Sequence, residues 1–299
     1  MKSEVAFQLK HADTHSAFKK IAGECIKHLQ SNQDMVLHGA DIEGVHQMRV
    51  ALRRLRCAFL VFRKIVGSAN SKTLMDELRS VADTLGRARD LDIFLIQTLP
   101  AVNAQFNDHS GLIKLRDKAL AAQAQAYIEV RKVLSTRRYH RMLLTLSDWI
   151  ENERWRQSTH ENKAPKVRAL ATAHLNKYHK QLKVSGKHLV NAQSEARHAT
   201  RIAAKKLRYT AEFFASLYSV AESRAYIRKL SQLQDCLGML NDIIITEKLL
   251  FNIVGSQPSR ALDDAFNILS GWNACNAIHG VTQMNKAWLK FSSQKPFWH

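Results

Sequence analysis

The stretch VHQMRVALRRLRCAFLVFRK, residues 45–64, concentrates positive charge in a segment without any acidic side chain. Wound into an α-helix of about 3.6 residues per turn, it separates its large apolar side chains from its basic ones. The apolar stripe consists of Met48, Leu52, Leu55, Phe59 and Phe62, and the basic stripe of His46, Arg49, Arg53 and Arg56. Like charges one turn apart destabilise an isolated helix. Either this basic face simply meets water, or an anionic partner compensates it.

The same pattern occurs a second time. Adding 152 to each residue number of HQMRVALRRLR, residues 46–56, aligns it with HATRIAAKKLR, residues 198–208. The same shift, without a gap, places LSQLQDCLGMLND (230–242) on LRSVADTLGRARD (78–90). One constant shift that aligns two separate motifs predicts a tandem duplication of a helical unit.

The rest of the sequence favours an all-α fold. Only 11 Gly and 4 Pro occur, good helix formers dominate, and no period-2 strand pattern or hairpin turn is found. We expect helices at about 4–31, 42–66, 71–98, 110–134, 137–153, 166–189, 194–218, 221–253, 258–277 and 280–292. We expect a single domain over residues 1–299, with repeat halves at about 5–135 and 160–290 and an extra helix at about 137–153 between them. Such a duplication forms either one pseudo-two-fold domain or two adjoining bundles.

The composition points to a polyanionic partner. The formal net charge is +19 and the sequence pI is about 10.0, with 14 further histidines. A surplus of this size suits nucleic acid, an anionic membrane surface or inorganic phosphate chains. The four cysteines form no C-x-x-C pair, so we expect no zinc site of common spacing. We also expect no cofactor. With no signal-like N-terminus and no apolar run of about 18 residues, we predict a cytoplasmic protein that does not enter a membrane.

The basic stripes are the candidate binding residues. Arginine presents a planar fork that matches two phosphate oxygens, lysine adds a point charge, and histidine gains charge toward pH 6. A water-exposed basic face is the simpler interpretation of one such helix. The recurrence of the pattern at matched positions favours a bound anion instead. The candidates are His46, Arg49, Arg53 and Arg56 with flanking Arg54, and His198, Arg201, Lys205 and Arg208 with flanking Lys206.

Two pairs of carboxylates repeat with the basic stripes: Asp83 with Asp90, and Asp235 with Asp242. They could bind a metal or act in catalysis, but beside so many cations we favour carboxylates that orient arginine side chains. Asp92 has no acidic counterpart and carries less weight. Gly86 and Gly238 interrupt the helices at matched positions, which predicts close approach of neighbouring helices there.

These motifs together resemble the CHAD domain, the conserved histidine α-helical domain. The resemblance rests on HQMRVALRRLRCAFLVF, LRSVADTLGRARDLD, RHATRIAAKKLRYTAEFF and LSQLQDCLGMLND, with STRRYHRMLLTLSDWIENERW (135–155) as a middle segment. It implies two pseudo-symmetric four-helix bundles with a basic channel between them that binds inorganic polyphosphate. It adds Arg89 and Arg138 as weaker candidates, although Asn241 stands where a second Arg89 would fall. No E-x-E-x-K motif of a triphosphate tunnel domain is present, so we expect a stand-alone member.

Three functions remain open on the sequence. The first is non-catalytic binding of polyphosphate, with targeting to polyphosphate granules as an extension; sulfate or phosphate is expected to fill the same site in crystals. The second is nucleic-acid binding, which is disfavoured because no aromatic residues interleave with the cations. The third is an enzyme of phosphate chemistry, which would need the aspartate pairs to hold a metal. We favour the first.

Overall fold

A computed structural model describes residues 7–39, 42–67, 69–106, 109–158, 165–187, 189 and 194–299. This part of the chain consists of helices and connecting turns, with no strand within those ranges. The predicted all-α fold class is confirmed. Among the described helices, none combines the length and the apolar character needed to cross a lipid bilayer.

The helices are grouped in two halves, with a middle segment between them. The first half contains α1 (Thr14–Ser31), α2 (Gln33–His38), α3 (Ile42–Val61), α4 (Arg63–Val66), α5 (Ala69–Ile93), the π-helix η1 (Phe94–Thr98), α6 (Leu99–Asn103) and α7 (Ser110–Leu134). A middle segment contains α8 (Arg137–Glu151) and the 3-10 helix η2 (Arg154–Ser158). The second half contains α9 (Val167–Gly186), α10 (Ser194–Phe214), the 3-10 helix η4 (Ala215–Leu217), α11 (Val220–Val254) and α12 (Arg260–Ser292).

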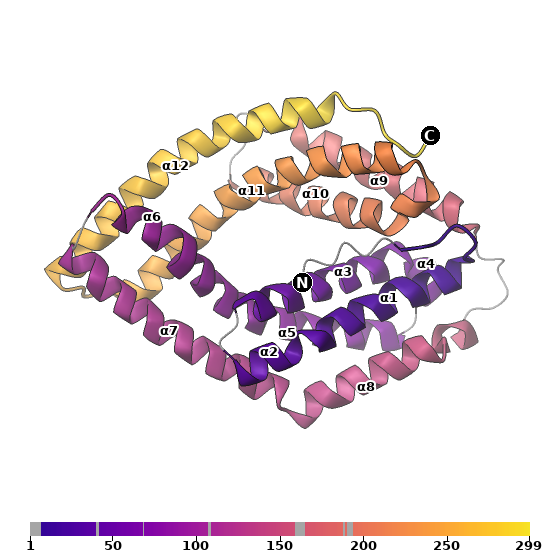
Figure 1. Ribbon diagram of the computed structural model, residues 1–299, viewed down its shortest axis with the longest axis horizontal. Coiled ribbons are helices and arrows are strands. Elements are labelled where there is room, and N and C mark those ends of the chain that lie inside the picture. The colour runs from indigo at the N-terminus through magenta and orange to yellow at the C-terminus, as the bar shows by residue number, and fades with distance from the viewer. Residues whose placement is uncertain are drawn as a thin grey trace.

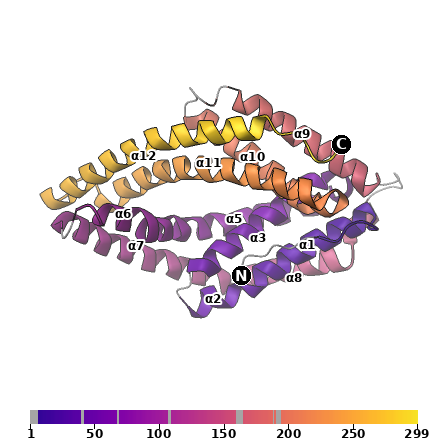
Figure 2. The ribbon, with the colours of Figure 1, turned by 45° about the horizontal axis from the view of Figure 1, so that its top comes forward.

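Consecutive long helices pack on one another in the same order in the two halves. Helix α1 packs on α3, α3 on α5 and α5 on α7, while α9 packs on α10, α10 on α11 and α11 on α12. The halves meet where α3 contacts α10, where α5 and α7 contact α11, and where α7 contacts α12. Figures 1 and 2 show α5 and α11 running between these contacts along the length of the molecule. The duplication, the pseudo-two-fold relation and the single-domain organisation stay predictions.

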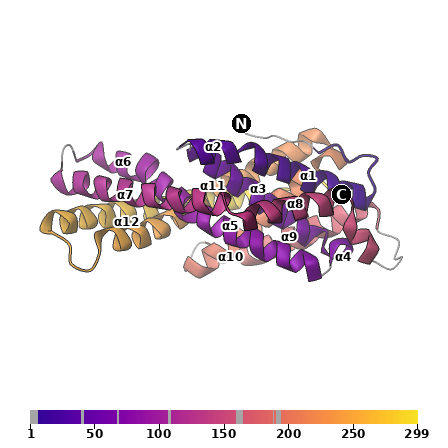
Figure 3. The ribbon, with the colours of Figure 1, turned by 90° about the horizontal axis from the view of Figure 1, so that it is seen from below.

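Two apolar clusters hold the described helices together. The larger one includes buried residues of both halves, and Phe62, which lies between α3 and α4, meets Phe214 of α10 with ring centroids 5.9 Å apart. The smaller one, around Phe94, Leu112 and Leu269, joins η1, α6, α7, α11 and α12. Figure 3 shows α6, α7 and α12 forming one end of the molecule, away from α1, α3 and α10. The region between the two clusters is therefore bounded by helices of both halves.

Two predicted helix boundaries were wrong. The first helix begins at Thr14 rather than near residue 4, because Asp13 caps it by accepting a hydrogen bond from Ser16 N at 2.9 Å. Residues 7–13 are not helical, and Phe7 and Leu9 are buried there, while residues 1–6 lie outside the described part of the chain. The predicted break near residues 278–279 does not occur.

Helix α12 continues through that predicted break because a glycine sits at a close helix contact. A Cβ on Gly280 would lie 2.4 Å from Cε of Met239 and 2.9 Å from Cδ2 of Leu240, both on α11. The glycine therefore lets α12 approach α11, and the helix tolerates its lower helix propensity of about 1 kcal/mol. The expected helices at 258–277 and 280–292 are thus one continuous helix.

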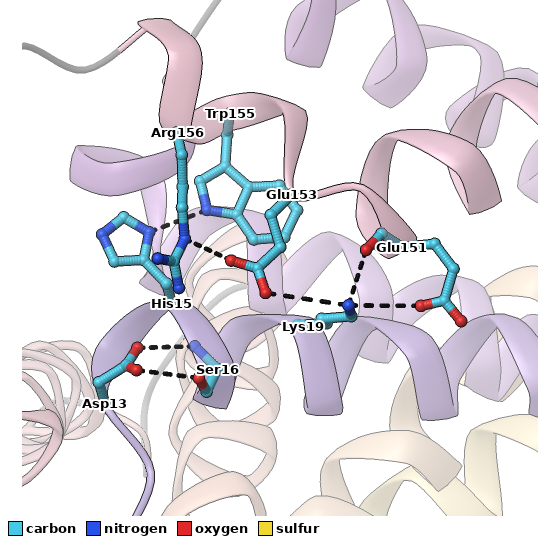
Figure 4. A network of polar contacts seen from close by, with 8 residues as sticks. All are labelled: Asp13, His15, Ser16, Lys19, Glu151, Glu153, Trp155 and Arg156. Carbon is cyan, nitrogen blue, oxygen red and sulfur yellow. Dashed lines mark hydrogen bonds and ion pairs between the residues drawn. The ribbon is translucent and has the colours of Figure 1, made fainter.

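A polar and aromatic contact ties the middle segment to α1 (Figure 4). Lys19 Nζ donates to the carbonyl of Glu151 at 2.7 Å, and Trp155 Nε1 donates to Nδ1 of His15 at 3.0 Å. The Trp155 ring is buried, with its centroid 4.9 Å from that of Phe18. Helix α8 also packs on α5 and α7, so the middle segment is fixed mainly to the first half.

The contact predicts a large stability effect at Trp155. We expect Trp155→Ala to lower the free energy of unfolding by about 3–5 kcal/mol, because a fully buried ring is replaced by a cavity. Trp155→Phe keeps one aromatic ring but loses the hydrogen bond to His15 and some buried volume, so we expect a smaller loss of about 1–2 kcal/mol. Urea denaturation of the three proteins measures both values, and equal losses in the two variants would contradict the importance of the ring.

Candidate functional site

A cavity of about 700 Å³ lies where the two halves meet, and its basic residues come from both. They are His46, Arg49 and Arg53 of α3, Arg89 of α5, and Arg201 and Lys205 of α10. Three carboxylates also line it: Asp90 of α5, and Asp235 and Asp242 of α11. The cavity thus combines nine of the sixteen residues that the sequence singled out.

The apolar faces of α3 and α10 aim these cations at the cavity. Met48, Leu52, Leu55 and Phe62 are completely buried, and Phe59 nearly so, which confirms the predicted apolar stripe. On α10 the same task falls to Ala204 and Leu207, which are also completely buried. Because each helix is fixed by its apolar side, the basic side must face the region between the halves.

Arg49 is held against the backbone of α5. Its Nη1 donates to the carbonyl of Ala82 at 2.9 Å. A Cβ on Gly86 would lie 2.7 Å from the same nitrogen, so the glycine makes room for the guanidinium. At Gly86, the close approach is therefore that of the Arg49 side chain to α5, and not of two helix backbones. Around Gly238 nothing lies within 4 Å of an added Cβ, because this residue lines the cavity, so the prediction of close helix packing was wrong there.

Burial and like charge disfavour ionisation inside the cavity. Burial, and after it the neighbouring Arg201 and Arg53, lower the pKa of Lys205 to about 7. Burial also raises the pKa of Asp90 and of Asp242, against the opposing effects of Arg49 and Arg201 respectively. The cavity therefore holds both kinds of charge at an energetic cost, which a bound anion would reduce on the cationic side.

The remaining cations of the cavity are also partly buried. Burial lowers the pKa of His46, and the nearby Arg89 lowers it further. Arg53 Nε donates to the hydroxyl of Tyr209 at 3.3 Å, across the contact between α3 and α10. Arg201 Nε is buried and has no hydrogen-bond partner among the described residues. Its donor is thus available to a ligand.

Three predicted residues of the first half lie outside the cavity. Arg54 is 6% exposed, and its guanidinium lies 5.5 Å from the centroid of the Phe7 ring. Arg56 continues along the same face of α3 but lies near Arg79 and Asp83, which influence its pKa. Burial is the main cause that lowers this pKa. Asp83 itself is exposed and lines a separate surface hollow.

Four other predicted cations also lie outside the cavity. Arg138 is exposed, with its Nε 3.3 Å from Oε1 of Glu77 on α5. His198 is exposed and lies 3.4 Å from Oδ1 of Asn241. The half-buried side chains of Lys206 and Arg208 do not line the cavity either, and Arg208 Nε lies 3.5 Å from Oε1 of Glu212.

The two halves therefore contribute unequally. His46 lines the cavity and is half buried, whereas its repeat counterpart His198 is exposed outside it. Arg89 lines the cavity, and Asn241 stands at its counterpart position next to His198. The substitution of Asn241 for an arginine, visible in the sequence, marked this inequality.

The sequence missed a neutral part of the same cavity. Its residues come from η1, α11 and α12, and they are Gln97, Thr98, Thr246, Trp272, Asn273 and Asn276. A signal for η1 in the sequence was Pro100. In a regular helix its ring would clash with a carbonyl one turn earlier. The widened π-helical turn η1 directly precedes this proline. Asn273 and Thr246 are polar residues at buried helical positions, which is a second signal.

Asp92, given little weight in the sequence, is completely buried beside the cavity. Its Oδ1 accepts from Gln123 Nε2 at 2.8 Å and its Oδ2 from the Tyr127 hydroxyl at 3.1 Å, both on α7. Burial raises its pKa, against these hydrogen bonds and the nearby Arg89. This carboxylate joins α5 to α7. Within the described ranges, no group of three His, Cys, Asp or Glu side chains is placed to hold a metal ion.

The two matched glycines give a stability test of the Arg49 contact. We expect Gly238→Ala to raise the free energy of unfolding by about 1 kcal/mol, because space is available and alanine favours the helix. Gly86→Ala forces the Arg49 guanidinium away from the Ala82 carbonyl, so it should be less stable than Gly238→Ala by about 1–2 kcal/mol. Thermal or urea unfolding compares the two, and equal stabilisation would contradict the contact.

Comparison with known proteins agrees with this fold. The crystal structure of the CHAD domain from the plant Ricinus communis superposes with a TM-score of 0.85 at 28% sequence identity, covering 98% of this chain and 96% of that chain. PptA from Streptomyces chartreusis superposes with a TM-score of 0.70 over 93% of this chain and 100% of that chain, at 15% identity, a likeness of fold alone.

Sequence comparison gives the family. An uncharacterized protein of Mycobacterium tuberculosis, Rv2226, is 30% identical over 182 residues, which are 60% of this chain and 35% of that protein. The chain thus spans about a third of the length of the curated relatives it matches. The family model of the CHAD domain matches residues 20–250, well over half of the chain. The chain therefore belongs to the CHAD domain family.

Proposed function

We propose that the cavity between the halves binds linear inorganic polyphosphate without chemical change. The observation that carries the proposal is the convergence of five cationic side chains and His46 on one cavity, from helices of both halves. The cations are Arg49, Arg53, Arg89, Arg201 and Lys205. A chain of phosphates presents about one negative charge per unit, and the forked donors of arginine suit its oxygens.

The carboxylates of the cavity fit this function as orienting groups. The pKa effects place Asp90 near Arg49 and Arg201, and Asp242 near Arg201 and Lys205. A carboxylate beside a guanidinium fixes its direction and reduces repulsion between neighbouring cations. The carboxylates are fewer than the cations, so the lining keeps a positive excess for a phosphate chain. The phosphates of the ligand would neutralise the positive charge that the aspartates leave uncompensated.

Cations outside the cavity extend the same surface. Arg56 follows Arg49 and Arg53 along the basic face of α3, so a long chain that leaves the cavity would pass near it. Affinity should fall steeply with salt, as it does when any polyanion releases bound counterions. In cells that store polyphosphate, we propose that such binding brings the protein to the granules. Nucleic acid is the competing ligand, because its phosphates would meet the same donors.

Neutralising two central arginines should remove binding. We expect Arg49→Gln with Arg201→Gln to weaken long-chain polyphosphate binding at least a hundredfold at 0.1 M salt, because each loses a charge-assisted contact worth about 1.5–3 kcal/mol. Glutamine is preferable to glutamate, which would add carboxylates beside Asp90 and Asp242. Isothermal titration calorimetry measures the affinity, and circular dichroism checks the helices.

The matched control changes the same charge elsewhere. Arg63→Gln with Lys64→Gln removes two exposed cations from α4 and should weaken binding less than threefold, since these residues lie outside the cavity. Equal losses in the two double variants would mean that net charge, not the cavity, binds polyphosphate. Displacement of polyphosphate by duplex DNA at equal phosphate concentration would favour nucleic acid as the ligand.

Binding should also depend on pH through Lys205. Its pKa of about 7 in the free cavity will rise when phosphates surround it, so binding takes up a proton above pH 7. Affinity is therefore expected to be full below about pH 7 and to fall as pH rises from 7 to 9, by up to tenfold per pH unit. Calorimetry in two buffers of different ionisation enthalpy measures the proton uptake directly.

Lys205→Arg is the control for this dependence. The guanidinium stays charged throughout this range, so the variant should bind with nearly constant affinity from pH 7 to 9. His46 does not interfere, because burial lowers its pKa below the ordinary histidine value and it titrates below this window. The same pH dependence in wild type and Lys205→Arg would show that another group carries the proton.

A further inference from the structure

One part of the cavity is built for a different chemistry from the rest. The side chains contributed by η1 and α12 are uncharged amides, a hydroxyl and an indole: Gln97, Thr98, Trp272, Asn273 and Asn276. The cations listed above come from α3, α5 and α10 instead. Figure 1 shows η1's neighbour α6 at the end of the molecule away from α3 and α10, while α12 runs from that end along α11. A ligand that spans the cavity therefore meets charge at one side and neutral donors and acceptors at the other.

Asn273 carries the strongest indication of a missing ligand. It lines the cavity, is 2% exposed, and its Nδ2 has no hydrogen-bond partner among the described residues. An unpaired buried donor costs about 1–3 kcal/mol, so such groups in native proteins usually have a partner. The residues that η1 and α12 contribute to the cavity carry no charge, so this part of the lining suits a neutral acceptor better than a phosphate oxygen.

Trp272 supplies the second feature. It lies next to Asn273 on α12, lines the cavity and is only partly buried, while it packs against the apolar cluster behind it. Met239, Ile243 and Ile245 of α11 add apolar surface to the same lining. An indole that is supported from behind and open to a cavity is a stacking surface for a flat ring, and amides at its edge can read ring nitrogens and exocyclic groups.

We propose that the neutral side of the cavity binds the base of a nucleoside polyphosphate whose phosphates occupy the cationic side. The proposal rests on the proposed phosphate-binding function and names a further ligand class for the same cavity. In this arrangement the base stacks on Trp272, Asn273 Nδ2 donates to a ring or exocyclic acceptor, and the phosphates meet Arg201, Lys205 and Arg49. The cavity volume of about 700 Å³ lies in the range of small-molecule sites.

The test compares two ligands with the same number of phosphates. ATP and inorganic tripolyphosphate each carry three, but tripolyphosphate bears more negative charge, so a purely electrostatic site prefers it. We expect wild-type protein to bind ATP at least tenfold more tightly than tripolyphosphate, measured by calorimetry at pH 7 without divalent cations. Equal or tighter binding of tripolyphosphate would overturn the proposal and leave a cavity whose neutral side binds only water.

Two variants locate the base. Trp272→Leu keeps apolar volume and removes the stacking ring, so the ATP to tripolyphosphate affinity ratio should fall about five- to a hundredfold, the range for losing one base–aromatic stack. Asn273→Leu removes the unpaired amide, which should lower the same ratio without loss of thermal stability. Asn285→Leu is the matched control on α12, because its Oδ1 also lacks a partner but it does not line the cavity. A ratio that falls equally in Asn285→Leu would contradict the assignment.

The outcomes separate this proposal from the proposed function. Long-chain polyphosphate is titrated in parallel into the wild-type protein. If it binds and ATP shows no preference over tripolyphosphate, only the base site is wrong. If long-chain polyphosphate does not bind while ATP does, the base site stands and the proposed polyphosphate function is wrong.

Discussion

Repulsion among partly buried cations is the constraint on which the centre of this protein depends. Arg49, Arg53, Arg201 and Lys205 share one cavity, where burial and, after it, the nearby Arg201 and Arg53 lower the pKa of Lys205 to about 7. Only rigid neighbours can hold such a group together: α3 and α10 are fixed by completely buried apolar faces, and the Ala82 carbonyl holds one guanidinium. The fold thus stores unfavourable electrostatic energy that an anion can release.

Much of this arrangement was predictable, because helical periodicity fixes the direction of a side chain around its helix. The burial of Met48 and Leu55, and the lining positions of Arg49 and Arg201, follow from that rule. Periodicity does not fix where along a helix its neighbour crosses. Arg56 shares the basic face of α3 yet lies one turn too far along to line the cavity, near Arg79 instead.

Long-range packing and departures from the repeat were harder to foresee. Arg54 is covered by Phe7, which is distant in sequence and belongs to a segment expected to be helical. The repeat predicted equal histidines, but His198 is exposed beside Asn241 whereas His46 lines the cavity near Arg89. A repeat predicts equal backbones, and the chemistry of each copy still depends on the residues that differ.

The neutral side of the cavity has a physical origin in the same irregularities. Pro100 is incompatible with a regular helix one turn earlier, so η1 is widened and presents Gln97 and Thr98 to the cavity. The unbroken α12 brings Asn273 and its unpaired amide to the same cavity. An anion on Lys205 alone would leave that amide unpaired, and a neutral ligand at Asn273 alone would leave the cations crowded. A ligand that satisfies both groups lowers the free energy at both sides, so the free cavity favours a molecule that is charged at one end and neutral at the other.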